Sequence, residues 1–169
     1  MKVDDREIRR RLDRFTAVAR ARGVALTPQR LEIFREVASS LEHPDAETVF
    51  RAVRPRMPTV SLDTVYRTLW MLDRLGLIAA IGPRRGSVRF DAKIERHHHY
   101  VCVRCGSMRD FESPALDALR IPASAKGFGT IIAAQVEVRG VCDRCAKEKP
   151  ERQAPTTPEP PRERRRRTT

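Results

Sequence analysis

The sequence predicts an α+β protein with a mainly helical N-terminal half and a small α/β unit after it. In the first half, apolar residues recur at helical spacing, and after residue 76 two segments of alternating polarity follow. Two Cys-x-x-Cys pairs then bracket the C-terminal unit. These three observations predict two structural units in a chain of 169 residues.

The composition limits the classes of partner. The chain has 34 Lys and Arg residues against 22 Asp and Glu residues, a formal net charge of +12. Such an excess attracts polyanions, above all nucleic acid. The apolar runs are much shorter than the roughly 20 residues that cross a bilayer, so no membrane association is expected. Because the charged N-terminus lacks the apolar stretch of a secretory signal, we expect a cytoplasmic protein.

Four helices are expected in the first half. The last three begin at residues that cap helix N-termini, namely Thr27, Asp45 and Ser61. The first and the fourth end at Gly23 and Gly76, which favour helix C-termini. Each predicted helix carries an apolar stripe on one face, so the four can share a core.

Two alternating segments, LIAAIG and SVRFD, follow the fourth helix and are joined by the basic sequence Gly82–Gly86. This pattern predicts a β-hairpin with a basic tip. Helices followed by such a hairpin are typical of a winged helix-turn-helix, whose last helix enters the DNA major groove. We therefore predict a DNA-binding domain over residues 1–87.

The fourth helix and the hairpin supply the candidate DNA contacts. Arg67 can pair with guanine or phosphate, and the ring of Tyr66 can contact a thymine methyl. Arg84 and Arg85 at the hairpin tip would contact phosphates or a narrow minor groove. The positions expected to be exposed on the helix are Ser61, Asp63, Thr64, Tyr66, Arg67 and Thr68. The alternative is that these are ordinary half-exposed helix residues.

After a hinge over residues 88–96, residues 97–147 are expected to form the α/β unit, with the order strand, strand, short helix, strand. The helix would start at Ser113 and contain Leu116 and Leu119, and the segment GTIIAAQVEVRGVC would form the last strand. Residues 148–169, rich in proline and with five arginines among the last eight residues, predict a disordered tail. That tail either improves solubility or adds phosphate contacts.

The four cysteines form two matched pairs, Cys102 with Cys105 and Cys142 with Cys145. Each pair spans a tight turn that directs two thiolates at one point, and two pairs complete the tetrahedral shell of a structural Zn²⁺ ion. A redox couple would not explain two matched pairs. The hydrophobic core of so small an α/β unit also needs stabilisation by a bound metal or a cross-link.

The histidines predict a second metal site. On a strand, His97 and His99 point to one face and His98 to the other, so two imidazoles can share one ion. His43, Asp91 and Asp110 are the further candidate ligands. Mixed imidazole and carboxylate ligands suit Fe²⁺, Mn²⁺ or Zn²⁺, and such a site could join the two halves of the chain. A polar surface cluster is the alternative.

Over residues 5–147 the chain resembles the ferric uptake regulator (Fur) superfamily of metal-dependent repressors. The motifs that carry the resemblance are LTPQR (26–30), EHPDAETVF (42–50), SLDTVYRTL (61–69), VRFD (88–91), HHHYVCVRCG (97–106), RDF (109–111) and GVCDRC (140–145). The resemblance implies a cytosolic homodimer with an N-terminal winged helix and a C-terminal dimerisation domain. It also implies a repressor that binds palindromic, AT-rich operators in double-stranded DNA when its regulatory metal is bound.

Residue by residue, the resemblance assigns the four cysteines to structural zinc and His43, Asp91, His97, His99 and Asp110 to the regulatory metal, Fe²⁺ or Mn²⁺. With aspartate at positions 91 and 110, this set is similar to the peroxide-sensing (PerR) branch. The resemblance then implies that iron and hydrogen peroxide oxidise His43 or His97, which ends repression. The sequence Tyr66-Arg67-Thr68 is closer to iron regulators, so an iron-, zinc- or manganese-responsive uptake regulator is the alternative.

Two hypotheses come from other classes. A metal-dependent hydrolase could use His97 and His99 to activate water. The sequence offers no obvious general base beside these ligands and no substrate pocket, so we expect no enzyme. An architectural DNA-binding protein would rely on charge alone, and its binding would be indifferent to chelators.

Overall fold

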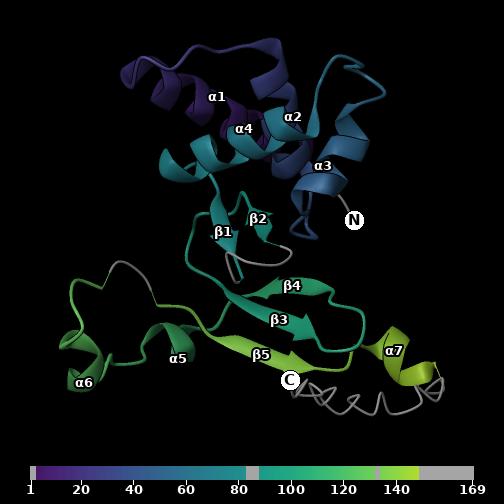
Figure 1. Cartoon of the computed structure of the whole chain (residues 1–169). Coiled ribbons are helices and arrows are strands. Elements are labelled where there is room, and N and C mark those ends of the chain that lie inside the picture. The colour runs from purple at the N-terminus through teal and green to yellow at the C-terminus, as the bar shows by residue number, and fades with distance from the viewer. Residues whose placement is uncertain (1–2, 83–87, 132–133, 149–169) are drawn as a thin grey trace, which may run out of the picture.

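The computed structural model describes residues 3–82, 88–131 and 134–148. It confirms the predicted α+β class. The N-terminal part holds four helices: α1 (Asp5–Ala21), α2 (Pro28–Ser39), α3 (Ala46–Val53) and α4 (Leu62–Arg74). They gather at one end of the molecule (Figure 1).

Side-chain caps determine where these helices begin. The side chains of Asp4, Thr27, Asp45 and Ser61 accept hydrogen bonds from backbone N–H groups in the first turn of α1, α2, α3 and α4. Three of these caps were predicted. Gly76 follows α4 with a φ of 67°, a left-handed conformation that glycine adopts without a Cβ clash. The apolar faces then meet in one core that includes Phe15, Phe34, Val49, Leu69 and Leu72.

The predicted hairpin consists of β1 (Ala79–Ile81) and β2 (Arg89–Asp91), paired antiparallel with Ala80 opposite Phe90. Phe90 is buried, and its ring centroid lies 5.7 Å from that of Trp70 on α4. This packing attaches the hairpin to the helices. The tip, with Arg84 and Arg85, lies outside the described residues, as does the predicted tail from residue 149.

The C-terminal part is a three-stranded sheet of β3 (His98–Cys102), β4 (Met108–Phe111) and β5 (Glu137–Gly140). The strand order is β4-β3-β5, with β3 antiparallel to β4 and parallel to β5. Between β4 and β5 lie α5 (Pro114–Asp117) and α6 (Ala123–Lys126), and α7 (Asp143–Lys147) follows β5. In Figure 1 the hairpin lies between this sheet and the four helices.

The structure corrects two details of the C-terminal prediction. The last strand is limited to Glu137–Gly140, because it pairs only where β3 runs beside it, from His99 to Cys102. Leu119 lies beyond the end of α5, which is a single turn capped by Ser113. Helices α6 and α7 were not predicted, and neither has a side-chain N-cap that would have signalled it.

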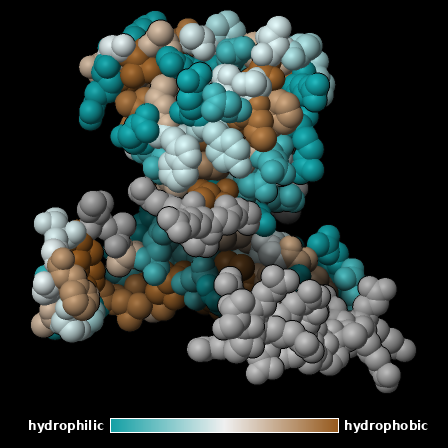
Figure 2. Space-filling model, viewed as in Figure 1, coloured by the Kyte–Doolittle hydropathy of each residue, from teal (hydrophilic) through white to brown (hydrophobic). Residues whose placement is uncertain are grey.

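Exposed apolar side chains are concentrated in the C-terminal part. Figure 2 shows hydrophobic atoms gathered near α5 and the beginning of β5. The large apolar residues exposed in this part include Leu119, Phe128, Ile131, Val138 and Val141. Among the described residues, no helix has the length and apolar character needed to cross a membrane.

Candidate metal centres

The four cysteines converge on one point. Their Sγ atoms all lie within 4.8 Å of one another, and none forms a disulfide. Cys102 ends β3 and Cys105 lies in the following turn, while Cys142 is the N-cap residue of α7 and Cys145 lies within α7. The predicted zinc ligands are therefore brought together by the pairing of β3 with β5, which lies directly before α7.

Backbone hydrogen bonds shape the turn that carries the first pair. Gly106 N–H donates to Cys102 O at 2.9 Å, and Cys102 N–H donates to Ser107 O at 2.8 Å. Gly106 has a φ of 68°, which a side chain there would disfavour. Across the site, Cys142 N–H donates to Cys102 Sγ at 3.3 Å, so the second pair is tied to the first.

The electrostatics of the cysteine cluster suit a cation. Hydrogen bonds from Ser107 lower the pKa of Cys105 to about 5. The pKa of Cys145 is raised to about 12, because its thiol hydrogen-bonds with Cys105 and is desolvated. Thiolates this close repel one another, and a divalent ion relieves that repulsion. Four sulfur ligands at this separation fit Zn²⁺ in a closed tetrahedral site.

The second cluster unites residues from both halves of the chain. One nitrogen or oxygen from each side chain lies within 4.8 Å of all the others. His43 lies just before α3, Asp91 ends β2, and Asp110 lies on β4. The five members are His43, Asp91, His97, His99 and Asp110, the set expected from the sequence.

The distances in this cluster are short, and most of its members are buried. His43 Nε2 lies 2.8 Å from Asp110 Oδ1, and His97 Nε2 lies 2.9 Å from Asp91 Oδ2. The three histidines and Asp91 are buried. Yet His43 Nε2, Asp91 Oδ2 and Asp110 Oδ1 have no partner with hydrogen-bond geometry. Buried polar atoms without partners are costly, and a metal ion at their common centre would satisfy all three.

The charges of the second cluster also favour a metal ion at its centre. Burial lowers the pKa of His43, but Asp110 and Asp91 outweigh burial and raise it to about 9. Burial raises the pKa of Asp91, but the nearby imidazoles of His43, His97 and His99 bring it far below its usual range. The cluster therefore combines carboxylates with a proton that a divalent cation can replace.

His97 and His98 point in opposite directions, as strand alternation predicts. Glu95 O lies 2.6 Å from His97 Nδ1, so Nδ1–H donates and Nε2 is directed into the cluster. On the other face, Val136 N–H donates to His98 Nδ1 at 3.3 Å, and His98 Nε2 lies 3.4 Å from Asp117 Oδ1. His98 is thus engaged by the segment before β5 and by α5.

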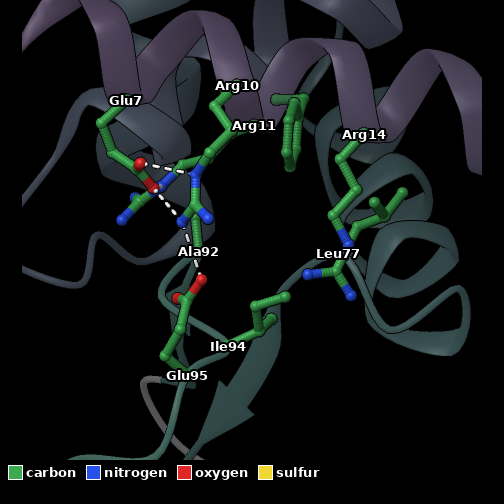
Figure 3. Close-up of a pocket in the computed structure, with 9 residues that line it drawn as sticks. Glu7, Arg10, Arg11, Arg14, Leu77, Ala92, Ile94 and Glu95 are labelled. Atoms are coloured by element: carbon green, nitrogen blue, oxygen red, sulfur yellow. Dashed lines mark hydrogen bonds and ion pairs between the residues drawn. The ribbon is translucent and has the colours of Figure 1, made fainter.

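The segment between Asp91 and His97 lies against α1, as Figure 3 shows. Arg10 on α1 forms ion pairs with Glu7 and with Glu95, and its Nη2 lies 2.7 Å from Glu95 Oε1. A small pocket lies between this segment and α1, with Arg11 and Arg14 of α1 among the residues that line it. The N-terminal helix therefore contacts the chain between two candidate ligands.

The candidate DNA contacts on α4 agree with the structure only in part. Ser61, Asp63, Tyr66 and Arg67 are exposed, and Arg67 Nε lies 3.2 Å from Asp63 Oδ2. Thr64 is half-buried, and its hydroxyl oxygen lies 2.8 Å from that of Ser61. The expectation that Thr68 is exposed was wrong.

Thr68 is buried because it lies on the apolar face of α4, one turn after Val65 and next to Leu69.

Sequence reasoning also missed Arg89 and Glu95 as neighbours of the metal cluster. Arg89 could have been found from its position two residues before Asp91 on a strand. Glu95 acts through its backbone carbonyl, for which the sequence has no signal.

Comparison with known proteins places this geometry in a family. The ferric uptake regulator family matches residues 21–138. The peroxide-responsive repressor PerR of Staphylococcus epidermidis is 32% identical over 148 residues, which cover 88% of this chain and 99% of that protein. PerR of Staphylococcus aureus (strain USA300) is 32% identical over 145 residues, covering 86% of this chain and 98% of that protein.

Solved structures agree with the fold. The ferric uptake regulator of Helicobacter pylori, described as having three functional metal binding sites, superposes with a TM-score of 0.68 at 21% identity. The match covers 89% of this chain and 99% of that one, and it supports the fold alone. A zinc-bound manganese uptake regulator superposes with a TM-score of 0.59 at 30% identity, covering 75% and 97%. The chain therefore belongs to the ferric uptake regulator family.

Proposed function

We propose that this protein is a metal-dependent, homodimeric transcriptional repressor that senses hydrogen peroxide in the cytoplasm. The observation that carries the proposal is the second cluster, in which His43, Asp91, His97, His99 and Asp110 join the helical part to the C-terminal sheet. An ion there would link the position of the helices to the position of the sheet. Loss of one ligand would release that link and change the geometry of DNA binding.

The DNA-binding role is supported by charge and by the helical part. The chain has a formal net charge of +12, and α4 exposes Tyr66 and Arg67. Four helices followed by a hairpin fit a winged helix-turn-helix, in which α4 would be the recognition helix. We propose residues 1–87 as this domain, 88–96 as the exit of the wing, which includes β2, together with the hinge, and 97–147 as the dimerisation domain. A palindromic operator in double-stranded DNA would match the two-fold symmetry of a dimer.

The homodimer is supported by the exposed apolar residues near β5. Val138 and Val141 are 41% and 39% exposed, and β5 is the last strand on its side of the described sheet. An apolar surface beside an unpaired strand edge favours association with a second copy.

The two centres would take different metals. We propose structural Zn²⁺ at the cysteine cluster and Fe²⁺ or Mn²⁺ at the second cluster, whose nitrogen and oxygen ligands suit those ions. Iron(II), when bound, supplies the reducing power that cleaves hydrogen peroxide. His43 and His97 are the side chains we propose to be oxidised, since both direct Nε2 into the cluster beside a carboxylate.

An uptake regulator that responds to iron, manganese or zinc is the second candidate. It is supported by the zinc-bound manganese uptake regulator, which is 30% identical to this chain. Both candidates are regulators rather than enzymes. Five protein ligands would leave a six-coordinate ion one open position, which is enough for peroxide but not for both the substrate and the water that a hydrolase must hold.

The decisive experiment is mass spectrometry of protein loaded with iron(II) without oxygen and then treated with a stoichiometric dose of hydrogen peroxide. Peroxide sensing predicts the mass of one added oxygen atom on the peptides with His43 or His97, together with loss of operator binding. Manganese-loaded protein is the control and should stay unmodified. If the histidines stay intact while operator binding still follows free metal, the protein is an uptake regulator.

A further inference from the structure

Arg89 lies on β2, two residues before Asp91. Residues two apart on a strand point to the same face, and the residue between them points to the other. Phe90 accordingly faces the helical core beside Trp70, while Asp91 faces His43, with 3.6 Å between His43 Nε2 and Asp91 Oδ2. The side chain of Arg89 is therefore on the side of the metal cluster.

The guanidinium of Arg89 holds the backbone of the segment that carries His43. Its Nη1 donates to Glu42 O at 3.2 Å and to His43 O at 3.3 Å. The backbone of β2 adds to this attachment, because Phe90 N–H donates to Pro44 O at 3.0 Å. The backbone carbonyls of Glu42, His43 and Pro44 thus all accept hydrogen bonds from β2.

His43 needs this support because its backbone conformation is unfavourable. Among the described residues it is the one non-glycine residue with a positive φ, 49°. L-residues rarely adopt that region, and they stay in it only when surrounding contacts impose it. In this conformation the buried imidazole places Nε2 2.8 Å from Asp110 Oδ1.

The other side of the guanidinium faces the turn of the cysteine cluster. A Cβ atom at Gly106 would lie 3.5 Å from Arg89 Nη2. Gly106 belongs to the turn that follows Cys102 and Cys105. Arg89 therefore lies between the His43 segment and this turn.

We propose that Arg89 is a positioning residue for the regulatory metal, which it controls by holding the His43 backbone so that the imidazole faces the ion. It does not bind the metal itself. This inference rests on the proposed function, since it takes the second cluster as a metal site. Through the same side chain, strand β2 is hydrogen-bonded to the His43 segment and comes close to the cysteine turn.

The test compares zinc-loaded wild type with Arg89→Ala, Arg89→Lys, His43→Ala and Arg51→Ala. Mn²⁺ affinity is measured by calorimetry, and Co²⁺ in the second site is followed by its visible absorption, which depends on the number and geometry of ligands. Arg51 is the matched control, because it is a second arginine close to the same segment. The positive charges of Arg89 and Arg51 both lower the pKa of Asp45, against the effect of burial and in addition to the hydrogen bonds from Thr48. Arg51 donates to Thr48 and not to the His43 segment.

Removing a positive charge near a cation site favours cation binding, so a loss of affinity must come from lost positioning. Arg89→Ala is expected to weaken Mn²⁺ binding about tenfold. Its Co²⁺ spectrum should approach that of His43→Ala. Arg89→Lys should recover most of the affinity, because one nitrogen contacts both carbonyls and a lysine can supply it. Arg51→Ala should match wild type.

Two results would overturn the inference. The first is wild-type Mn²⁺ affinity and a wild-type Co²⁺ spectrum in Arg89→Ala. The second is loss of bound zinc and of thermal stability in both Arg89 variants, which would make Arg89 a folding residue. Failure of the proposed function is distinguishable from both, because wild type and His43→Ala would then bind Mn²⁺ equally weakly.

Discussion

Glu95 fixes the orientation of His97 through its main-chain carbonyl, which lies 2.6 Å from His97 Nδ1. The hydrogen bond leaves Nε2 as the nitrogen that enters the metal cluster. The side chain of Glu95 pairs at the same time with Arg10 on α1. One residue therefore connects the N-terminal helix to a candidate metal ligand.

This connection predicts that α1 influences metal-activated DNA binding. Arg10→Glu should cause a few-fold loss of operator affinity at limiting Mn²⁺, because two acidic side chains would then repel at the position of the ion pair. The effect should be small, since both side chains are largely exposed. The double variant Arg10→Glu/Glu95→Arg should restore part of the binding, because it re-forms the ion pair with position 95 but not the pair with Glu7. Arg9→Glu on the same helix is the charge-matched control, and an equal loss there would point to general electrostatics.

The cysteine cluster predicts that zinc maintains the C-terminal part. Cys142→Ser should reduce the zinc content from one ion per chain to nearly none and abolish dimerisation, because so small an α/β unit depends on its metal. Metal analysis and sedimentation would measure the two effects. Ser107→Ala, which removes a hydrogen bond that lowers the pKa of Cys105, should weaken zinc binding without eliminating it. A folded, dimeric Cys142→Ser protein without zinc would contradict the structural role.

The sequence predicted most elements, the cysteine cluster and the His97–His99 pair because their signals are local or strictly periodic, whereas the assignment of His43, Asp91 and Asp110 to the same site rested on the family resemblance. Three helix caps, the alternation of His97 to His99 and the two Cys-x-x-Cys pairs each depend on spacing within a few residues. The features that the sequence could not predict, such as the burial of Thr68 and the length of the last strand, depend on tertiary contacts. The position of Thr68 in the recognition helix predicts an exposed side chain, but the core contacts of α4 bury it. The last strand is short because β3 is its partner over only four residues.

The distinction between Thr68 and its neighbours leads to a prediction on DNA binding. Arg67→Ala should cost about 1–3 kcal/mol of operator affinity if the side chain reads a base, and should reduce the salt slope by about 1 if it contacts phosphate. Thr68→Val, which keeps the shape of a buried side chain, should leave operator affinity unchanged. Titration of labelled operator at several salt concentrations measures both. A larger loss in Thr68→Val than in Arg67→Ala would mean that another face of α4 contacts DNA.

The charges of the second cluster predict how metal binding depends on pH. The pKa of His43 is raised from 6.5 to about 9, so in the metal-free protein its proton stabilises the fold fully below pH 6.5, and this contribution is lost as the pH rises through about 9. Since a metal ion must displace that proton, Mn²⁺ affinity should increase from pH 7 to pH 9. Calorimetry in two buffers of different ionisation enthalpy should detect proton release at pH 7.5. His43→Ala should bind more weakly and release fewer protons, and equal proton release in the two proteins would assign the proton to another group.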